Sequence, residues 1–382
     1  MKTILIIGGN FINKGAESML MATVSGIRKN FPGFEPVLID LFPVKTASEK
    51  TEYDFRIVNM HVRTLFRISF PFLKLVFRRN RLSEDEKEIK SLFAEASALF
   101  DISGYGLSAH NQPLLWSVAY LLPFRLARKS GVPVWLLPQS FGPFNFKGVK
   151  KLLFKIWGQS LLNYPELAFA REPEGFEDLQ AVREKPCLLS PDIVLQRDLN
   201  VELQSGDEVI VIPNRQLFNF SEPDKVVRFF SDIIQRFLEK ELVVRIVRHS
   251  RDDEELCRSI SGLISHNSLI VDSSDYSIKA LIEQISKARF VVSARYHGAV
   301  HALICHKPIL IIGWAGKYRY LAQLFGISNQ LIDLQHRRIE DINIPAYVDG
   351  LVSEKDNLTE CISTRLKEIR HNSFWNHINL KS

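Results

Sequence analysis

The sequence predicts an α/β protein made of two Rossmann-like, doubly wound lobes that face each other across a cleft. Short apolar runs of strand length alternate with amphipathic helical segments along most of the chain. This alternation is typical of parallel sheets with helices on both faces. The chain has 382 residues, more than a single hydrophobic core usually supports.

The first lobe is predicted over residues 1–197. Its first strand is the apolar run Ile4–Ile7, and the helix that follows covers Gly15–Lys29. Further strands of this lobe are expected at Pro36–Asp40, Ala98–Asp101, Val132–Leu137, Leu167–Ala170 and Cys187–Leu189.

A polar stretch, residues 196–207, separates this lobe from a second one predicted over residues 206–345. Residues 346–382 form a polar helical tail, which by analogy with similar architectures would pack back on the first lobe. Strands of the second lobe are expected at Glu208–Ile212, Leu242–Val247, Ser268–Val271, Phe290–Val292 and Pro308–Ile311. Helices are expected from Pro223, Asp252 and Ser277, and over Gly298–Ile304.

Composition places the chain among ordinary globular proteins. Hydrophobic residues make up 46% and charged residues 24%, values far from those of disordered chains. The formal net charge of +6 fits an anionic ligand or surface. The sequence contains no DNA- or RNA-binding motif, so we expect no nucleic-acid partner.

Four cysteines are present, and they form no CxxC pair and no zinc-ligand spacing, which is typical of free thiols in a reducing compartment. The apolar run near Met1 is too short for the core of a signal peptide. No stretch is long and apolar enough to span a bilayer. We therefore expect a cytoplasmic protein with no metal and no bound cofactor.

Residues 64–81 interrupt the alternation of strands and helices. Aromatic and aliphatic residues alternate there with arginine and lysine, and no acidic residue occurs. One interpretation is a peripheral contact with the inner face of the membrane or with a lipid-linked acceptor. The other is an amphipathic element packed on the first lobe. Pro71 rules out one long helix here, and the sequence leaves both interpretations open.

In the first lobe, polar turns follow the predicted strands, where parallel sheets bind their ligands. The turn Gly8–Glu17 has glycines that allow close approach to a ligand, and its helix start offers N–H groups to an anion. It matches neither GxGxxG nor a Walker loop. Helix capping and tight turning are the alternative interpretation of all these turns. The candidate site residues are Asn10, Asn13, Glu17, Gly104, Gln139, Arg171 and Asp192.

The densest group of candidates is Ser293–His301 in the second lobe. Arg295 and His297 are two positions apart at a predicted strand end, so we expect their side chains on the same side. A fixed cation beside an imidazole can bind an anion and transfer a proton. His297 and His301 have i, i+4 spacing, but without an HExxH motif or a third ligand we expect no zinc site. The other candidates in this lobe are His249, Ser293 and Lys317.

In their order along the chain, these motifs resemble the polysaccharide pyruvyltransferase family. The matching pieces of the first lobe are the GNxxNKGAE turn, Pro-Gln-Ser-Phe-Gly-Pro, Ala-Arg-Glu and Ser-Pro-Asp. In the second lobe they are the segment at His249 and Ser-Ala-Arg-Tyr-His-Gly, followed by Pro308 and Lys317. Two positions depart from the family pattern: Ala16 stands where members often carry Asp, and Trp314 where they often carry Tyr.

The resemblance implies a GT-B-like fold, as in two-lobed glycosyltransferases. It also implies transfer of a pyruvyl group from phosphoenolpyruvate, as co-substrate, to two hydroxyls of one sugar in a polysaccharide or its precursor. The products are a pyruvate ketal and phosphate. His297 would act as general acid or base beside Arg295. The donor residues would be Arg171, Arg295, Lys317 and Ser293, and the acceptor residues Asn10, Asn13, Glu17, Gly104, Gln139, Asp192 and His249.

Two other classes of function stay open. A glycosyltransferase of the same architecture would bind a nucleotide sugar, with Asp272 or Asp275 on the ribose. A family member that has lost catalysis would act as a binding protein, although the presence of both Arg295 and His297 argues against this. Stabilisation by phosphoenolpyruvate or by a nucleotide sugar would distinguish these functions.

Overall fold

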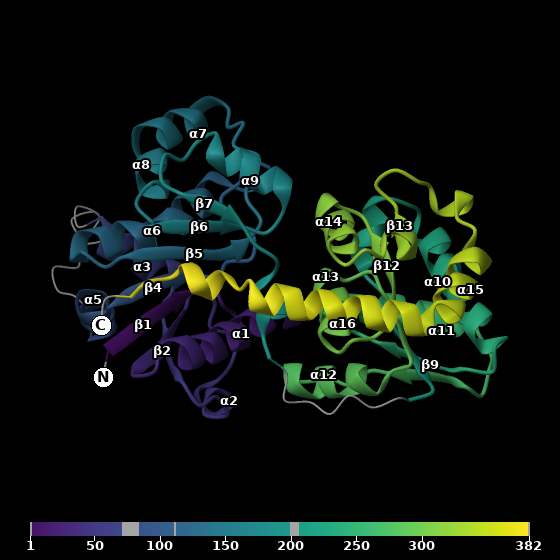
Figure 1. Ribbon diagram of the computed structural model, residues 1–382. Helices are drawn as coiled ribbons and strands as arrows, with labels where there is room; N and C mark the ends of the chain where they lie inside the picture. Colours follow the sequence, from purple (N-terminus) through teal and green to yellow (C-terminus); the bar gives the residue numbers. More distant parts are fainter. Residues whose placement is uncertain (1, 71–83, 111, 199–205, 381–382) are drawn as a thin grey trace. The chain divides into compact units, whose positions relative to one another are not determined.

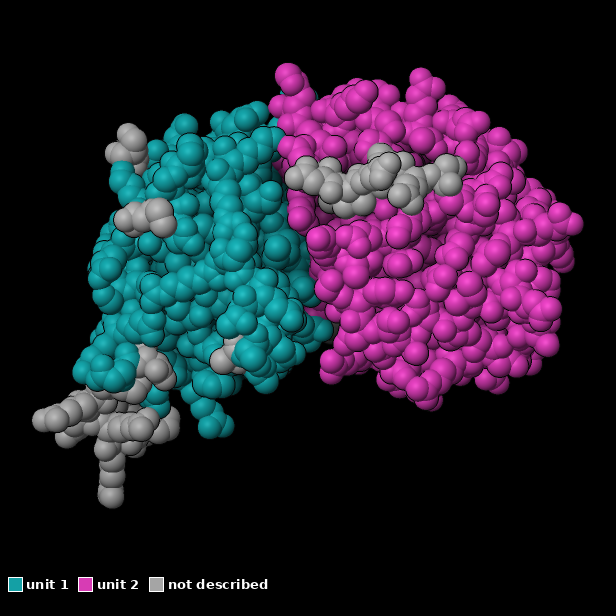
Figure 2. Space-filling view, turned by 90° about the horizontal axis from the view of Figure 1, so that it is seen from below, with its two compact units in different colours: residues 1–12, 16–193, 372–382 teal, residues 13–15, 194–371 magenta. Residues whose placement is uncertain are grey.

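The computed structural model describes residues 2–70, 84–110, 112–198 and 206–380 (Figure 1). The chain divides into two compact units, shown in different colours in Figure 2. The first unit comprises residues 1–12, 16–193 and 372–382, and the second comprises residues 13–15 and 194–371. Each unit is built on a parallel sheet with helices, which confirms the predicted α/β class.

The sheet of the first unit has seven strands within the described residues, in the order β3-β2-β1-β4-β5-β6-β7. The strand order reverses between β1 and β4, and open α/β sheets bind ligands at such a switch point. The strands are β1 (Lys2–Ile7), β2 (Phe34–Asp40), β3 (Arg56–Asn59), β4 (Ala98–Asp101), β5 (Val134–Gln139), β6 (Leu167–Ala170) and β7 (Cys187–Leu189).

Both faces of this sheet are covered, so its central strands are almost wholly apolar. Leu5 and Ile7 of β1 belong to a core cluster with residues of α3, α5 and α6. Phe100 of β4 instead contacts Phe31, which follows α1. The helices are α1 (Lys14–Asn30), α2 (Ala47–Lys50), α3 (Val62–Ser69), α5 (Glu84–Glu95), α6 (Leu114–Ser130), α7 (Gly148–Leu153), the π-helical η1 (Phe154–Gly158), α8 (Gln159–Leu162) and α9 (Pro173–Gln180).

The described part of the second unit holds six strands in the order β10-β9-β8-β11-β12-β13, so its switch point lies between β8 and β11. The strands are β8 (Glu208–Ile212), β9 (Val243–Val247), β10 (Leu269–Asp272), β11 (Phe290–Ser293), β12 (Ile309–Gly313) and β13 (Leu331–Asp333). The helices are α10 (Pro223–Leu238), α11 (Glu254–Gly262), α12 (Ile278–Lys287), α13 (Tyr296–Ile304), α14 (Gly316–Leu324), α15 (Ile344–Ser353) and α16 (Lys355–His371).

Most predicted strands lie within two residues of their observed bounds, and β4, β6, β7 and β8 match exactly what the apolar runs indicate. The edge strands β3 and β13 were not predicted, because they are short and have few apolar residues. The prediction that Gly298 begins a helix is wrong. Helix α13 begins at Tyr296, because Arg295 already adopts the extended conformation of an N-cap.

The C-terminal residues divide between the units. Helices α15 and α16 belong to the second unit, and residues 372–382 belong to the first. There the indole of Trp375 lies 6.0 Å from the rings of both Phe31 and Phe100. A side chain at Gly26 would collide with this indole, so Trp375 is a packing residue of the first unit.

Residues 64–70 are the described part of the basic and aromatic segment 64–81, and residues 71–83 lie outside the described part. In α3, Leu65 and Ile68 are buried in the core, and Phe66 packs against the same cluster. Arg67 forms an ion pair with Glu86 at 2.5 Å. Residues 64–69 are therefore part of an amphipathic helix packed on the first unit, which is the second of the two interpretations of this segment. Among the described helices, none combines the length and the hydrophobicity that crossing a membrane requires.

Candidate active site

The carboxyl edge of the second unit's sheet collects the densest group of predicted residues. Asn214 follows β8, His249 follows β9, Arg295 follows β11 and Trp314 follows β12. Because β8 and β11 flank the switch point, Asn214 and Arg295 lie where an open sheet offers its crevice. No group of three His, Cys, Asp or Glu side chains suited to a metal ion occurs among the described residues.

Arg295 is held by a buried carboxylate. Its Nε and Nη2 donate to the two oxygens of Asp253 at 2.9 and 2.5 Å, and Asp253 is fully buried. The backbone N–H groups of Arg215 and Ser250 donate to the same carboxylate. This bidentate pair fixes the plane of the guanidinium and leaves Nη1 as the nitrogen outside the fork. Arg295 is thus a rigid cation at the sheet edge.

Three imidazoles lie beside this cation. The rings of His249 and His301 stack with centroids 5.5 Å apart, and His297 lies 6.4 Å from His301. Burial lowers the pKa of His249 well below its usual value, and the nearby charges of His301, Arg295 and His297 lower it further. His249 is therefore neutral at physiological pH.

Arg295 and His297 lie in a different secondary structure from the one predicted. Strand β11 ends at Ser293, so Arg295 is the N-cap of α13 and His297 lies in its first turn. The strand alternation expected for the two side chains does not apply. Helix geometry sets the direction of His297, whereas Arg295 keeps the extended backbone of an N-cap.

Ser293, predicted to bind the donor, uses its hydroxyl within the loop. Its Oγ donates to the carbonyl of Arg295 at 2.9 Å and accepts from the Arg295 N–H at 3.2 Å. A side chain at Gly298 would collide with this hydroxyl. The side-chain amide of Asn214 donates to the carbonyl of Ala294 at 2.9 Å. Ser293 and Asn214 therefore shape the turn that carries Arg295.

Lys317 lies in the first turn of α14 among three aromatic rings. Its Nζ is 5.2 Å from the ring centre of Tyr296, 5.4 Å from that of Trp314 and 5.8 Å from that of Tyr318. Cation–π attraction holds the ammonium over these rings. The Tyr318 hydroxyl donates to the carbonyl of Ala294 at 2.9 Å. Tyr296 immediately precedes His297, so Lys317 lies on the same edge as the predicted catalytic pair.

In the first unit, Arg171 is buried at the end of β6 and fully engaged. It donates to Asp192 at 2.8 Å, to Ser140 Oγ at 2.6 Å and to the carbonyl of Gly104 at 3.2 Å. Asp192 is also buried. The structure thus joins the predicted donor residue Arg171 to the predicted acceptor residues Gly104 and Asp192 in one internal network. That network ties the turns after β4, β5, β6 and β7 together.

Gln139 belongs to a second buried network. Its amide donates to Asp101 at 3.0 Å, and the hydroxyls of Ser103 and Tyr120 donate to the same carboxylate at 2.5 and 2.9 Å. Burial raises the pKa of Asp101, although these donors oppose that shift. Gln139 is therefore an internal residue at this edge. A side chain at Gly8 would collide with Ser103, which explains the glycine at the end of β1.

The N-terminal turn places its three predicted residues differently. Asn10 accepts from the N–H of Ile12 at 3.0 Å and is part-exposed. Asn13 is exposed and belongs to the short segment assigned to the second unit. Glu17 is buried and accepts from the hydroxyl of Tyr53 at 2.9 Å. His249, the remaining predicted acceptor residue, belongs to the second unit.

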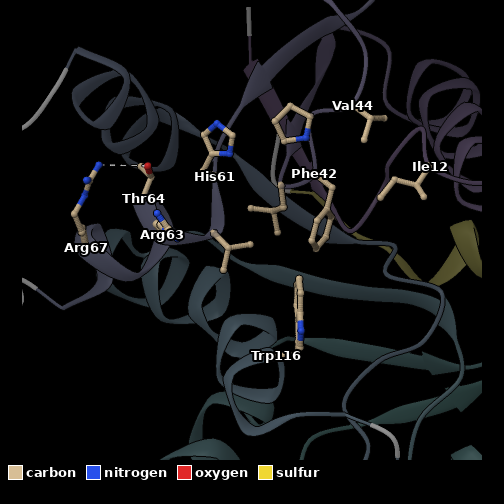
Figure 3. A pocket seen from close by; sticks show the side chains of 11 residues that line it. Ile12, Phe42, Val44, His61, Arg63, Thr64, Arg67 and Trp116 are labelled. Atoms are coloured by element: carbon tan, nitrogen blue, oxygen red, sulfur yellow. Dashed lines mark hydrogen bonds between the residues drawn. The ribbon is translucent and has the colours of Figure 1, made fainter.

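An open groove of about 720 Å³ lies on the first unit at the carboxyl ends of β2 and β3. Figure 3 shows the side chain of Phe42 directed toward Trp116, and the centres of the two rings are 5.4 Å apart. Trp116 is 46% exposed. The lining residues are Ile12, Leu41, Phe42, Pro43, Val44, His61, Val62, Arg63, Thr64, Arg67 and Trp116. An apolar floor with a basic margin suits a ligand with both apolar faces and polar groups.

The sequence reasoning missed Asp253 as the partner of Arg295, and it missed the groove. The Ser250–Asp253 spacing is that of a capping box, and the structure contains one. A capping box predicts the start of a helix, but it does not predict that Asp253 binds Arg295, which is 42 positions away. Phe42, His61 and Trp116 belong to no sequence motif. They are far apart in the chain, and only the order of the strands brings them together.

The two acids considered for a ribose have protein partners. Asp272 accepts from Arg245 at 3.3 Å and from Tyr276. Asp275 accepts from Arg251 at 3.0 Å. Each of these acids is paired with an arginine in the described structure. Their positions therefore give no support to a nucleotide-sugar site.

Comparisons with known proteins identify the family and the fold of the chain. Residues 13–316 match the family model described as polysaccharide pyruvyl transferase. A comparison of the sequence with curated proteins gives no match.

Solved structures share the fold at low sequence identity. A co-structure of S. aureus MnaA with UDP matches with a TM-score of 0.56 at 11% identity, covering 100% of this chain and 99% of that one. A putative UDP-N-acetylglucosamine 2-epimerase from Listeria monocytogenes gives 0.57 at 11%, covering 99% and 98%. A UDP-forming trehalose-phosphate synthase from Burkholderia vietnamiensis gives 0.53 at 10%, covering 98% of both chains. These likenesses confirm the GT-B-like fold.

Proposed function

The chain belongs to the polysaccharide pyruvyl transferase family, and on that premise we propose that it transfers a pyruvyl group from phosphoenolpyruvate to two hydroxyls of one sugar. The product is a pyruvate ketal on a polysaccharide or its precursor, and phosphate is released. The observation that carries the proposal is Arg295, fixed by Asp253 at the switch point of the second sheet, with His297 two residues beyond it in the first turn of α13.

The negative charges of phosphoenolpyruvate complement the cations at the carboxyl edge of the second sheet. Phosphoenolpyruvate carries a carboxylate and a phosphate, so its site needs cations that converge. Arg295 offers Nη1 outside its pair with Asp253, and Lys317 brings an ammonium beside Tyr296. The first-turn N–H groups of α13 add the positive end of a helix dipole. We assign the donor to Arg295, His297 and Lys317.

The reaction needs a proton on the methylene carbon of the donor. In our proposal His297 gives that proton, which makes C2 electrophilic. One sugar hydroxyl adds to C2 and loses its proton, and the second hydroxyl then forms a C2–O bond as the C2–O bond to phosphate breaks. His297 regains the proton of the first hydroxyl, and the proton of the second hydroxyl leaves with the phosphate. The neutral His249 beside it adds no competing positive charge.

The acceptor is assigned to the first unit. The apolar face of a sugar ring suits the exposed ring of Trp116 beside Phe42, and sugar hydroxyls suit His61 and Arg63, which also line the groove. Asn10 lies in the turn that also contributes Ile12 to this groove. The buried residues Gln139, Asp192 and Glu17 form hydrogen bonds within the first unit, and we assign them a structural role there.

Ligand-induced stabilisation tests the donor. A ligand that binds only the folded state raises the melting temperature by mass action. We expect phosphoenolpyruvate to stabilise the protein, and we expect the Arg295→Ala variant to lose the shift. Arg289→Ala, which removes a part-exposed arginine four residues before the end of β11, serves as the matched control and should keep it.

A second arm separates the alternatives. Stabilisation by UDP-sugars with no response to phosphoenolpyruvate would overturn the proposal in favour of glycosyl transfer. A positive phosphoenolpyruvate shift is followed by phosphate release in the presence of candidate sugar acceptors. Release that continues undiminished in His297→Gln would remove that residue from the mechanism.

A further inference from the structure

The segment from α7 through η1, residues 148–158, presents an apolar stripe to solvent. Val149, Leu152, Leu153 and Ile156 follow the i, i+3, i+4, i+7 spacing of one helix face. Their side chains are 37 to 70% exposed. Apolar residues at this spacing normally face a core, so an exposed stripe marks an interaction surface.

The other face of the same segment already has its partners. Phe154 packs on Phe144 and Phe146, with ring centres 5.9 and 4.9 Å away. Trp157 lies 6.0 Å from Phe70. The segment is thus anchored to the first unit by Phe154 and Trp157, and Figure 1 shows α7 at the margin of that unit beyond β7. The exposed stripe is the face that remains.

The charged residues in the stretch of chain that carries the stripe are all basic. Lys147, Lys151 and Lys155 are exposed beside it. Residues 102–165 contain seven lysines and arginines and no aspartate or glutamate. This stretch of the chain offers no acidic side chain to the cations of a partner protein, whereas an anionic lipid surface complements its lysines and arginines.

The first turn of α6 extends the same surface. Leu115 is 66% exposed, and its neighbour Leu114 lines a small cavity together with Leu153. The ammonium of Lys150 donates to the carbonyl of Gln112, just before α6. The stripe and Leu115 therefore belong to one continuous side of the first unit, which also carries Trp116 of the groove.

We propose that this surface, defined by Leu115, Val149, Leu152, Leu153 and Ile156 with its flanking lysines, docks the protein on an anionic lipid bilayer. The apolar side chains enter the boundary between head groups and acyl chains, and the lysines lie over anionic head groups. The residues that define this surface are not those of the segment 64–81, and the proposal stands whether or not the proposed reaction is correct.

Vesicle co-sedimentation of the full chain tests the proposal. We expect binding to vesicles of phosphatidylcholine mixed with phosphatidylglycerol, weak binding to pure phosphatidylcholine, and release by salt. Leu152→Glu and Ile156→Glu should each lower the partition coefficient by about tenfold or more. Lys151→Ala with Lys155→Ala should lower it roughly twenty-fivefold, at about fivefold for each lysine.

Matched controls are available in the second unit. Leu263→Glu makes the same change at a leucine that is 55% exposed, and Lys279→Ala removes an exposed lysine; both should bind vesicles as the parent chain does. The proposal is overturned if the parent chain fails to bind anionic vesicles, or if the stripe variants bind as well as the controls. It is also overturned if the lipid-free chain dimerises by light scattering and Leu152→Glu abolishes the dimer, because a second copy would then cover the stripe.

Discussion

Arg295 and Asp253 form a bidentate ion pair at the carboxyl edge of the second sheet, with N–O distances of 2.9 and 2.5 Å. The pair joins the N-cap of α13 to the start of α11. It keeps the guanidinium in one orientation although Arg295 is partly exposed.

Asp253→Asn should loosen the guanidinium and leave Arg295 in place. We expect a fall in kcat/KM for phosphoenolpyruvate of about tenfold to a hundredfold, since a charge-assisted hydrogen bond contributes about 1.5–3 kcal/mol. Steady-state kinetics and thermal unfolding measure the two effects. Asp252→Asn, at the neighbouring exposed aspartate, should change neither. Unchanged kinetics in Asp253→Asn would show that the pair serves stability alone.

His297→Gln should remove proton transfer and keep much of the donor binding. Because a positioned general acid contributes about 10²–10⁴ in rate, we expect a loss of that size in kcat. The phosphoenolpyruvate-induced stabilisation should survive. His336→Gln, at an exposed histidine of the second unit, is the control. A variant with normal kcat would contradict the assigned role.

The second unit should lose stability in mild acid through His249. Its folded-state pKa is lowered, chiefly by burial, so the unfolded chain binds the proton more readily. The contribution of neutral His249 is complete above about pH 6.5, the ordinary pKa of histidine, and declines as the pH falls below it. Denaturant unfolding across this range should show a flatter profile in His249→Gln. An unchanged slope would assign the acid sensitivity to other groups.

Arg171 and Asp192 should behave as a buried pair. Removing only one partner leaves an uncompensated buried charge, so Arg171→Met should destabilise the first unit by about 3–5 kcal/mol. Arg171→Met with Asp192→Leu should regain part of this loss, because the buried Glu172, which also pairs with Arg171 at 3.4 Å, keeps its charge. We expect the double variant to keep the phosphoenolpyruvate-induced shift. Loss of that shift in a stable double variant would return Arg171 to the donor site.

Trp116→Ala should weaken the acceptor and spare the donor. We expect KM for the sugar acceptor to rise about tenfold, because an exposed aromatic face contributes on the order of 1 kcal/mol or more, while the phosphoenolpyruvate shift stays constant. Leu115→Ala, at the adjacent exposed position outside the groove, is the control for kinetics. Equal acceptor KM in Trp116→Ala and the parent chain would place the acceptor elsewhere.

The sequence alone determined the two parallel sheets and the segment that carries Arg295 and His297. Burial on both faces makes central strands continuously apolar, so β4, β6 and β8 can be identified from local composition. The order of the motifs along the chain was sufficient to indicate the family. These signals are local, and each can be read within a few neighbouring residues.

Tertiary structure decided which separated residues meet and which face remains exposed. Asp253 reaches Arg295 across 42 positions because the loops after β9 and β11 lie on one sheet edge. Arg171 and Gln139 read as ligand residues in the sequence, yet the packing of neighbouring turns buries both. The stripe at Val149 and Ile156 has the periodicity of a core-facing helix. Periodicity predicts that the apolar side chains share one face of a helix, but it does not predict what covers that face. The face is exposed because α7 lies at the margin of the first unit.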